Sequence, residues 1–381
     1  MSNIKYLKLR FPEFTGEWEV RKLGELIKVN MCKRIFSNQT ASIGEVPFYK
    51  IGTLGDKADS YISRELFEEY KDKYNYPRKG EILITCSGTV GKTVIYDGRD
   101  SYYQDSNIVW LNNDNKIICN SIIKIIISRI DWNRKLNSTT ITRLYNDDIR
   151  SLIIEFPTEK EEQQKIGDFF MLLDKRIEQQ EQKIALLKDY KKAMMQKIFS
   201  QKIRFKDDNG NDYPDWEEKK FLNIFFSIPS RAYQIFKTEI FSNGKIPVVD
   251  QGKKKVAGYS NEIKKICDKT PCIVFGDHTT ELKYIDFPFI IGADGTKILR
   301  NHIANSTLFL YYLLLENNVE QEGYKRHFSI LTKKSFDIPM IKEQEKIASF
   351  LSTIDFNIEK QEGILENLKN QKGVLLHKMF I

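Results

Sequence analysis

One stretch of this sequence occurs twice, and this repeat limits what the chain can fold into more than any other feature. The first copy covers Glu162–Phe199 and the second covers Glu343–Phe380, at an offset of 181 residues and without a gap. Of the 38 aligned positions, 15 are identical. Such agreement indicates that one helical element is present in two copies. The chain therefore alternates between two globular units and two similar helices.

Both copies carry apolar residues at the alternating four- and three-residue spacing of a coiled coil. Neither contains proline, and at about 1.5 Å per residue each predicts a helix of about 50 Å. Each apolar stripe is interrupted twice by polar residues, at Gln180 and Lys191 in the first copy and at Gln361 and Lys372 in the second. So narrow a stripe favours a coiled-coil seam over a solvated helix on a domain surface.

We expect the two helices to pair with each other in antiparallel orientation. The segments that join helices and globular units are short, and an antiparallel return needs no long crossing connection. A parallel pair in register would also place Lys191 against Lys372, and the two ammonium groups would repel each other.

The globular units contain short β-rich runs separated by Gly, Asn and Asp, together with one helix candidate each, from Asn120 and from Ser306. Weak echoes link the units: "VPFYKIG" from Val46 resembles "IPVVDQG" from Ile246. The predicted fold class is α+β, with two mixed, β-rich domains separated by two long α-helices that form an antiparallel coiled coil, and with a pseudo-twofold internal repeat. We place the domains at 1–157 and 204–338, and the helical segments at 158–203 and 339–381.

Composition excludes several classes of protein. The 381 residues are too many for one core. The net charge of +8 is a mild excess and only weak support for an anionic partner. The five cysteines form no C-x-x-C pair and the four histidines show no metal-ligand spacing. Together with the lack of a signal peptide, this cysteine usage favours the reducing cytoplasm, and no apolar run approaches the length of a membrane helix.

Enzyme motifs are not apparent. The run "CSGTVGKT" from Cys86 resembles a phosphate-binding P-loop, but that motif needs four residues between its glycines, and here only Thr89 and Val90 separate Gly88 from Gly91. "PDWEEKK" from Pro214 resembles a nuclease motif, but its spacing is too compressed to place two carboxylates around a metal. No glycine-rich dinucleotide loop and no catalytic triad signature occurs, although triads can be hidden in sequence. The chain is expected to bind rather than to catalyse.

Two different globular units that alternate with two similar long helices resemble the specificity subunit of bacterial type I restriction-modification systems. The resemblance covers nearly the whole chain. The "PTEKEEQQKI" and "PMIKEQEKI" openings of the helices are its most specific elements, followed by "SGTVGK", by "GDHTTELKYIDFPFIIGADGTKIL" and by "KLGEL" after Trp18. One departure is that the second unit begins "WEEKKFLNIF" and has no clear copy of "KLGEL".

The resemblance implies that each globular unit is a target recognition domain for one half of a bipartite, gapped site in double-stranded DNA. It also implies that the helices act as a ruler between the half-sites. Independently, units held at opposite ends of a rod of about 50 Å would meet DNA somewhat more than one turn apart, since a turn is about 34–36 Å. Two methyltransferase subunits that use S-adenosylmethionine and two restriction subunits that use ATP and Mg²⁺ would be the partners. This chain would hold no cofactor and no metal, would have no catalytic residue, and would not contact a membrane.

Loops with small, hydroxyl-bearing or basic residues are the candidates for DNA contact, because they admit close approach to phosphates and base edges. Each also has an ordinary structural explanation, as a hairpin turn, a solvated lysine or a satisfied loop histidine. In the first unit the candidates are Ser87, Gly88, Thr89, Lys92 and Arg143. In the second unit they are Lys253, Lys254, Lys255, Tyr259, His278, Thr279, Thr280, Lys283, Tyr324, Lys325 and Arg326.

Two other classes of function stay open at this point: a coiled-coil scaffold that binds only proteins, and an enzyme with an active site hidden in the sequence. Within the DNA-binding class, the chain could also be an orphan protein without restriction partners.

Overall fold

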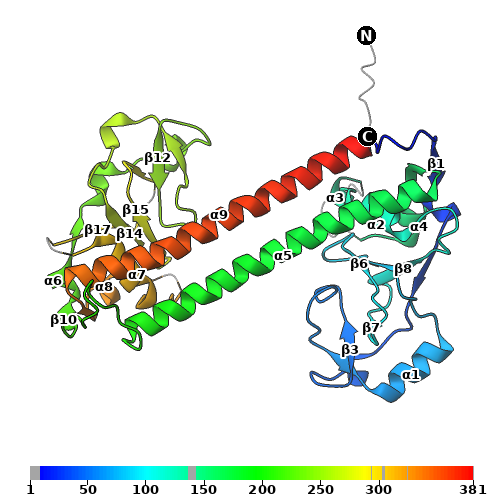
Figure 1. Cartoon of the computed structure of the whole chain (residues 1–381), viewed down its shortest axis with the longest axis horizontal. Coiled ribbons are helices and arrows are strands. Elements are labelled where there is room, and N and C mark those ends of the chain that lie inside the picture. Colours follow the sequence, from blue (N-terminus) through cyan, green and yellow to red (C-terminus); the bar gives the residue numbers. More distant parts are fainter. Residues whose placement is uncertain (1–8, 136–142, 293, 303–304, 324, 381) are drawn as a thin grey trace, which may run out of the picture. The chain divides into compact units, whose positions relative to one another are not determined.

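The structure is a computed structural model that describes residues 9–135, 143–292, 294–302, 305–323 and 325–380. The chain divides into two compact units. Unit 1 contains Met1–Gln179 and Leu365–Ile381, and unit 2 contains Gln180–Ile364. Each unit therefore combines one globular domain with part of each long helix (Figure 1).

The domain of unit 1 is built from three small sheets. Its first and last strands pair antiparallel, a four-stranded antiparallel sheet has the order β2-β8-β5-β6, and a three-stranded sheet has the order β4-β3-β7. The strands are β1 (Trp18–Lys22), β2 (Lys28–Met31), β3 (Val46–Tyr49), β4 (Tyr61–Ile62), β5 (Ile82–Thr85), β6 (Thr93–Ile95), β7 (Tyr102–Tyr103), β8 (Ile108–Asn112) and β9 (Ile153–Pro157). The helices are η1 (Leu23–Glu25), η2 (Ser37–Gln39), α1 (Arg64–Lys73), α2 (Asn120–Ser128), α3 (Trp132–Lys135) and α4 (Asn146–Arg150).

The domain of unit 2 repeats this topology strand for strand, with the orders β10-β18, β11-β17-β14-β15 and β13-β12-β16. The strands are β10 (Glu217–Lys220), β11 (Phe225–Ile228), β12 (Ile246–Val249), β13 (Gly258–Ser260), β14 (Cys272–Gly276), β15 (Leu282–Ile285), β16 (Ile290–Ile291), β17 (Thr296–Asn301) and β18 (Ser335–Ile338). The helices are α6 (Phe221–Ile224), η3 (Ser230–Tyr233), η4 (Lys237–Glu239), η5 (Ile263–Lys265), α7 (Thr307–Glu316) and α8 (Phe328–Leu331). The weak sequence echoes therefore reflect a complete structural repeat.

The missing "KLGEL" in the second unit does not change its fold. In unit 1, the N–H of Leu23 follows β1 and donates to the carbonyl of Leu152 at 2.7 Å. In unit 2, the N–H of Phe221 follows β10 and donates to the carbonyl of Lys334 at 2.9 Å. The same turn is thus built from different residues, because it is specified by backbone pairing and by the burial of Leu23 and Phe221.

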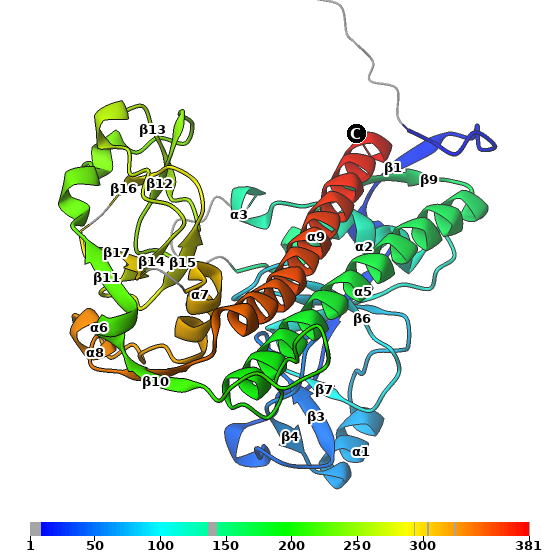
Figure 2. The same cartoon turned by 60° about the vertical axis from the view of Figure 1, so that its left-hand side comes forward.

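The two repeated stretches form the long helices α5 (Lys160–Phe199) and α9 (Ile341–Met379). At about 1.5 Å per residue, each is about 60 Å long. They lie side by side and antiparallel, as expected (Figure 2). Their apolar seams are buried against each other and against the domains, with Ile166, Ile198 and Ile347 completely inaccessible.

Polar side chains in the seam explain the antiparallel orientation. Gln180 Nε2 donates to Gln361 Oε1 at 3.0 Å, so equivalent residues of the two copies meet each other. Lys191 Nζ lies 2.6 Å from Asp355 Oδ1. Lys372 pairs with Asp174 in the equivalent way. The same sequence in parallel register would have opposed lysine to lysine and aspartate to aspartate, so the prediction is confirmed and its physical reason is visible.

The Glu-Gln pair that opens each repeat fastens the helix to its domain. In unit 1, Glu162 is fully buried and its Oε2 lies 2.6 Å from Arg10 Nη2. Gln163 Nε2 donates to the carbonyl of Pro157 at 2.8 Å, and Gln163 Oε1 accepts from the N–H of Cys119, the residue before α2. A buried carboxylate requires such a partner, which accounts for Arg10 ahead of β1.

Unit 2 contains the same anchor. Glu343 is fully buried and its Oε2 lies 2.8 Å from Arg204 Nη2. Gln344 Nε2 donates to the carbonyl of Pro339 at 2.8 Å, and Gln344 Oε1 accepts from the N–H of Ser306, the N-cap of α7. The helix starts and the domain cores are therefore rigidly connected in each unit.

Candidate nucleic-acid interface

The "SGTVGK" run is the loop of a β-hairpin. It joins the antiparallel strands β5 and β6, so Lys92-Thr93 leads into a strand rather than into the helix N-terminus that a P-loop requires. Gly91 has φ +81°, and a Cβ at this position would lie 2.0 Å from Cδ1 of Trp132 on α3. Gly91, which resembled the last glycine of a phosphate-binding loop, is needed because only a residue without a side chain lets the hairpin pack against Trp132.

The hairpin presents its polar residues to solvent. Gly88, Thr89 and Lys92 are exposed, and Ser87 is half-buried. Ser87 Oγ donates to Asn107 Oδ1 at 2.8 Å. Burial raises the pKa of the adjacent Cys86 thiol to about 11, so this buried thiol is protonated near neutral pH. The exposed part of the loop offers hydroxyl, amide and ammonium donors suited to phosphates or base edges.

Arg143 lies beside this hairpin. The N–H of the next residue, Leu144, donates to the carbonyl of Cys86 at 2.8 Å. The exposed guanidinium of Arg143 is 3.3 Å from Ser106 Oγ and 5.8 Å from the ring centre of Tyr145. The structure thus brings together all five candidate residues of unit 1.

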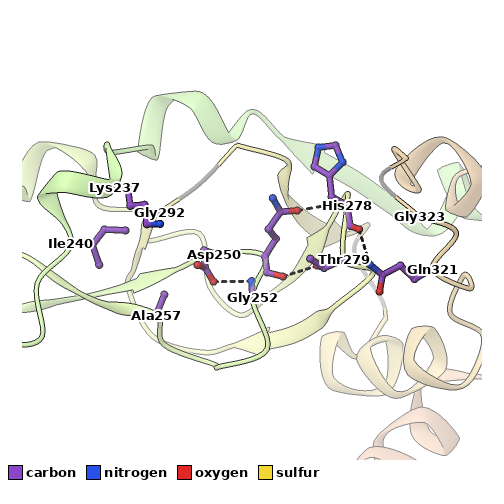
Figure 3. A pocket seen from close by; sticks show the side chains of 11 residues that line it. Lys237, Ile240, Asp250, Gly252, Ala257, His278, Thr279, Gly292, Gln321 and Gly323 are labelled. Carbon is purple, nitrogen blue, oxygen red and sulfur yellow. Dashed lines mark hydrogen bonds between the residues drawn. The ribbon is translucent and has the colours of Figure 1, made fainter. Parts of the chain in front are cut away.

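In unit 2 the corresponding hairpin joins β14 and β15. Its loop, 277–281, is two residues shorter than the 86–92 loop of unit 1. The N–H of His278 donates to Gln251 Oε1 at 3.2 Å, and Thr279 Oγ1 donates to the carbonyl of Gln251 at 2.6 Å. The loop that follows β12 is therefore fastened to the hairpin, as Figure 3 shows.

A pocket of about 690 Å³ opens between these loops (Figure 3). Backbone and side-chain polar groups converge on it: Gln321 Nε2 donates to the carbonyl of His278 at 3.3 Å, and Asp250 Oδ1 accepts from the N–H of Gly252 at 2.9 Å. Donors and acceptors side by side on a concave surface suit hydrogen bonding to base edges. The lining consists of Lys237, Ile240, Asp250, Gln251, Gly252, Ala257, His278, Thr279, Gly292, Gln321 and Gly323.

Two candidates of unit 2, Lys283 and Thr280, are buried, so the structure leaves them little exposed surface for a direct contact with DNA. The side chain of Lys283 is only 5% exposed, and its Nζ donates to the carbonyl of Asp250 at 2.7 Å. The pKa of this ammonium group is lowered overall, because the effect of burial exceeds the opposite effect of the neighbouring Asp250 carboxylate. Thr280 is also buried and has φ +57°, and its hydroxyl donates to the carbonyl of Thr279 at 2.7 Å. Both residues therefore make hydrogen bonds within the domain that support the hairpin.

The other candidates of unit 2 lie on two more segments. Lys253, Lys254 and Lys255 are exposed in the loop after β12, where Lys255 Nζ lies 3.7 Å from Asp286 Oδ1. Tyr259 is half-buried on β13. Lys325 and Arg326 are exposed, and Lys325 Nζ lies 3.1 Å from Glu322 Oε2. Tyr324 lies outside the described residues.

Sequence reasoning missed His327 and Gln251. His327 is fully buried; its Nε2 accepts from the N–H of Glu322 at 3.0 Å, so its Nδ1 carries the proton and donates to the carbonyl of Asp277 at 3.0 Å. It thereby fastens the 322–327 segment to the hairpin. The similarity between "VPFYKIG" and "IPVVDQG" could have drawn attention to Gln251, which lies in the second stretch. Nothing in the sequence distinguishes His327 from the other histidines.

The sequence model of the type I restriction modification DNA specificity domain matches residues 15–189 and 213–370. A type I restriction enzyme specificity subunit of Haemophilus influenzae is 50% identical over 157 residues, which are 41% of this chain and 40% of that protein's length. The MjaX specificity subunit of Methanocaldococcus jannaschii is 24% identical over 98% of this chain and 95% of its own.

Solved structures show the same fold. The crystal structure of the S subunit from M. genitalium has a TM-score of 0.68 and 16% identity, and the match covers 98% of this chain and 99% of that one. In the described part of the chain, no helix has the length and apolar character needed to cross a membrane. Because the family model matches most of its length, the chain belongs to the type I restriction-modification DNA specificity family.

Proposed function

We propose that this chain is the non-catalytic subunit that selects the DNA site of a type I restriction-modification complex. Each domain would recognise one half of a bipartite, gapped site in double-stranded DNA. The observation that carries the proposal is that one scaffold occurs twice with different hairpin loops, "CSGTVGK" and "DHTTE". Two copies that share a framework but carry different residues in the equivalent hairpin loop suit the recognition of two different half-sites.

The chemistry would belong to the partners. We propose two methyltransferase subunits that use S-adenosylmethionine and two restriction subunits that use ATP and Mg²⁺. Two features support a binding role for this chain: the loop most similar to a phosphate-binding motif is a β-hairpin, and its cysteine is a buried, protonated core residue. The five unpaired cysteines agree with a cytoplasmic location.

Methylation sequencing tests this proposal. Single-molecule sequencing of the source genome, with and without this gene, should show one bipartite adenine-methylated motif that disappears when the gene is deleted. An unchanged set of methylated motifs would contradict the proposed function. A gel shift with duplex DNA separates the remaining alternatives, because a scaffold that binds only proteins would not retard DNA, whereas an orphan DNA-binding protein would do so without any change in methylation.

A further inference from the structure

The repeated topology allows the residues around the two hairpins to be compared position by position. In unit 1, Leu144 donates its N–H to the carbonyl of Cys86, the first residue after β5. In unit 2, His327 donates its N–H to the carbonyl of Asp277, the first residue after β14, also at 2.8 Å. The residues that immediately precede these donors are Arg143 and Arg326, so the two arginines occupy equivalent places in the two domains.

Two other charged positions around the hairpins reverse their sign between the two units. The residue before the second hairpin strand is Lys92 in unit 1 and Glu281 in unit 2. The residue directly after the central strand of the three-stranded sheet is Lys50 in unit 1 and Asp250 in unit 2. Positions that reverse their charge cannot serve both half-sites in the same way.

Arg143 and Arg326, by contrast, share charge, place and exposure. Among the described residues, Arg143 makes a weak hydrogen bond to Ser106 at 3.3 Å and lies 5.8 Å from the ring centre of Tyr145. Among the described residues, no hydrogen bond or ion pair engages the guanidinium of Arg326. Their main chains are nevertheless fixed at the base of the hairpins, by the neighbouring bonds to Cys86 and Asp277. A fixed main chain that carries an available cation beside a recognition loop is preorganised for an anion.

We propose that Arg143 and Arg326 are equivalent phosphate anchors, one for each half-site. The adjacent hairpin loops would contact the bases and determine which DNA sequence is bound. This inference rests on the proposed function and divides its contacts into two kinds. Phosphate contacts carry no sequence information, so one residue type can serve two different half-sites, whereas base-recognising residues must differ. The shared arginines and the divergent hairpins follow this division.

Equilibrium DNA binding by the full chain tests the assignment. Arg143→Ala and Arg326→Ala are each measured over a range of salt concentrations, with a duplex that carries the methylated motif and with one of unrelated sequence. Each variant should lower affinity for both duplexes by the same factor, about fivefold at 0.15 M salt, and reduce the salt slope by about 0.9. Arg→Lys should restore most of the binding, because a phosphate needs only a nearby cation, while a bidentate base contact needs the guanidinium.

Arg150→Ala is the matched control, since Arg150 is an exposed arginine of unit 1 that is paired with Asp147 within α4. It should leave affinity and slope unchanged. A loss confined to the motif-bearing duplex with an unchanged slope would overturn the assignment, and so would unchanged affinity for both duplexes. If the wild-type chain bound neither duplex, the proposed function itself would fail.

Discussion

The ion pairs in the seam of α5 and α9 give a prediction whose size follows from the structure. Lys372 pairs with Asp174, and their side chains keep 26% and 39% of their exposure. Two unit charges about 4 Å apart attract by about 4 kcal/mol at an effective dielectric of about 20. Partial exposure and side-chain entropy reduce this to about 1 kcal/mol. Charge reversal at one position replaces this attraction with a repulsion of similar size, so Lys372→Glu should lower the free energy of unfolding by about 2 kcal/mol.

A double-mutant cycle isolates this pair. Lys124 Nζ lies 3.9 Å from Asp174 Oδ2, so Lys124→Gln is introduced in every background to remove the second contact. Lys372→Glu and Asp174→Lys should each lower the melting temperature by about 4–8 °C. The double variant should recover most of the loss, with a coupling energy of about 4 kcal/mol, because each single reversal costs about 2 kcal/mol, and this energy should shrink at high salt.

Thermal and urea unfolding, followed by circular dichroism, measure these effects. The equivalent pair Lys191–Asp355 provides an internal comparison, because it occupies the same place in the second half of the seam. Strictly additive single effects, with no recovery in the double variant, would refute the conclusion that these charges select the antiparallel register.

Three further predictions concern single residues. Gly91→Ala should destabilise the hairpin by about 1–3 kcal/mol, because it adds a side chain at positive φ and against Trp132; hydrogen exchange of the β5–β6 amides would detect the opening, and unchanged protection would contradict it. Glu343→Gln should lower the free energy of unfolding by about 2–3 kcal/mol, because Arg204 loses its buried charged partner, and the equivalent Glu162→Gln should lower it by a similar amount. Urea titration measures both values. An unchanged free energy of unfolding in either variant would refute the anchoring role. Burial lowers the pKa of Lys283 in the folded state, so the unfolded chain holds its proton to higher pH. The free energy of unfolding of the wild type should therefore rise relative to that of Lys283→Met as pH increases toward 10.5. Melting temperatures of the two proteins that change in parallel from pH 8 to 10.5 would contradict this.

The helices and their pairing could be predicted because their specification is local and repeated. The heptad spacing is visible within a few residues, and the 181-residue offset aligns the two polar breaks. The anchors could not be predicted, since Arg10 and Glu162 are 152 residues apart and only the folded domain brings them together. The sequence showed only that Glu162 lies in a repeated opening, without indicating its role or its partner.

The candidate contact residues were identified less completely, for a related reason. The hairpin loops were found because small and hydroxyl-bearing residues between β-rich runs are a local signal. The burial of Lys283 was not visible in the sequence, because its ammonium group is bonded to Asp250 on a distant loop. The burial of Thr280, whose backbone has φ +57°, was not visible either. Exposure is a property of tertiary packing, and a list of polar loop residues cannot separate contacts from supports.

The central claim is that the two hairpins are separate determinants of two half-sites. It is tested most directly by replacing residues 277–281 with the 86–92 sequence of unit 1 and sequencing the methylated adenines of cells that carry the variant. The account predicts that one half of the motif changes while the other half and the length of the gap are retained. An unchanged motif in an active, fully assembled enzyme, or simultaneous change of both halves, would contradict it.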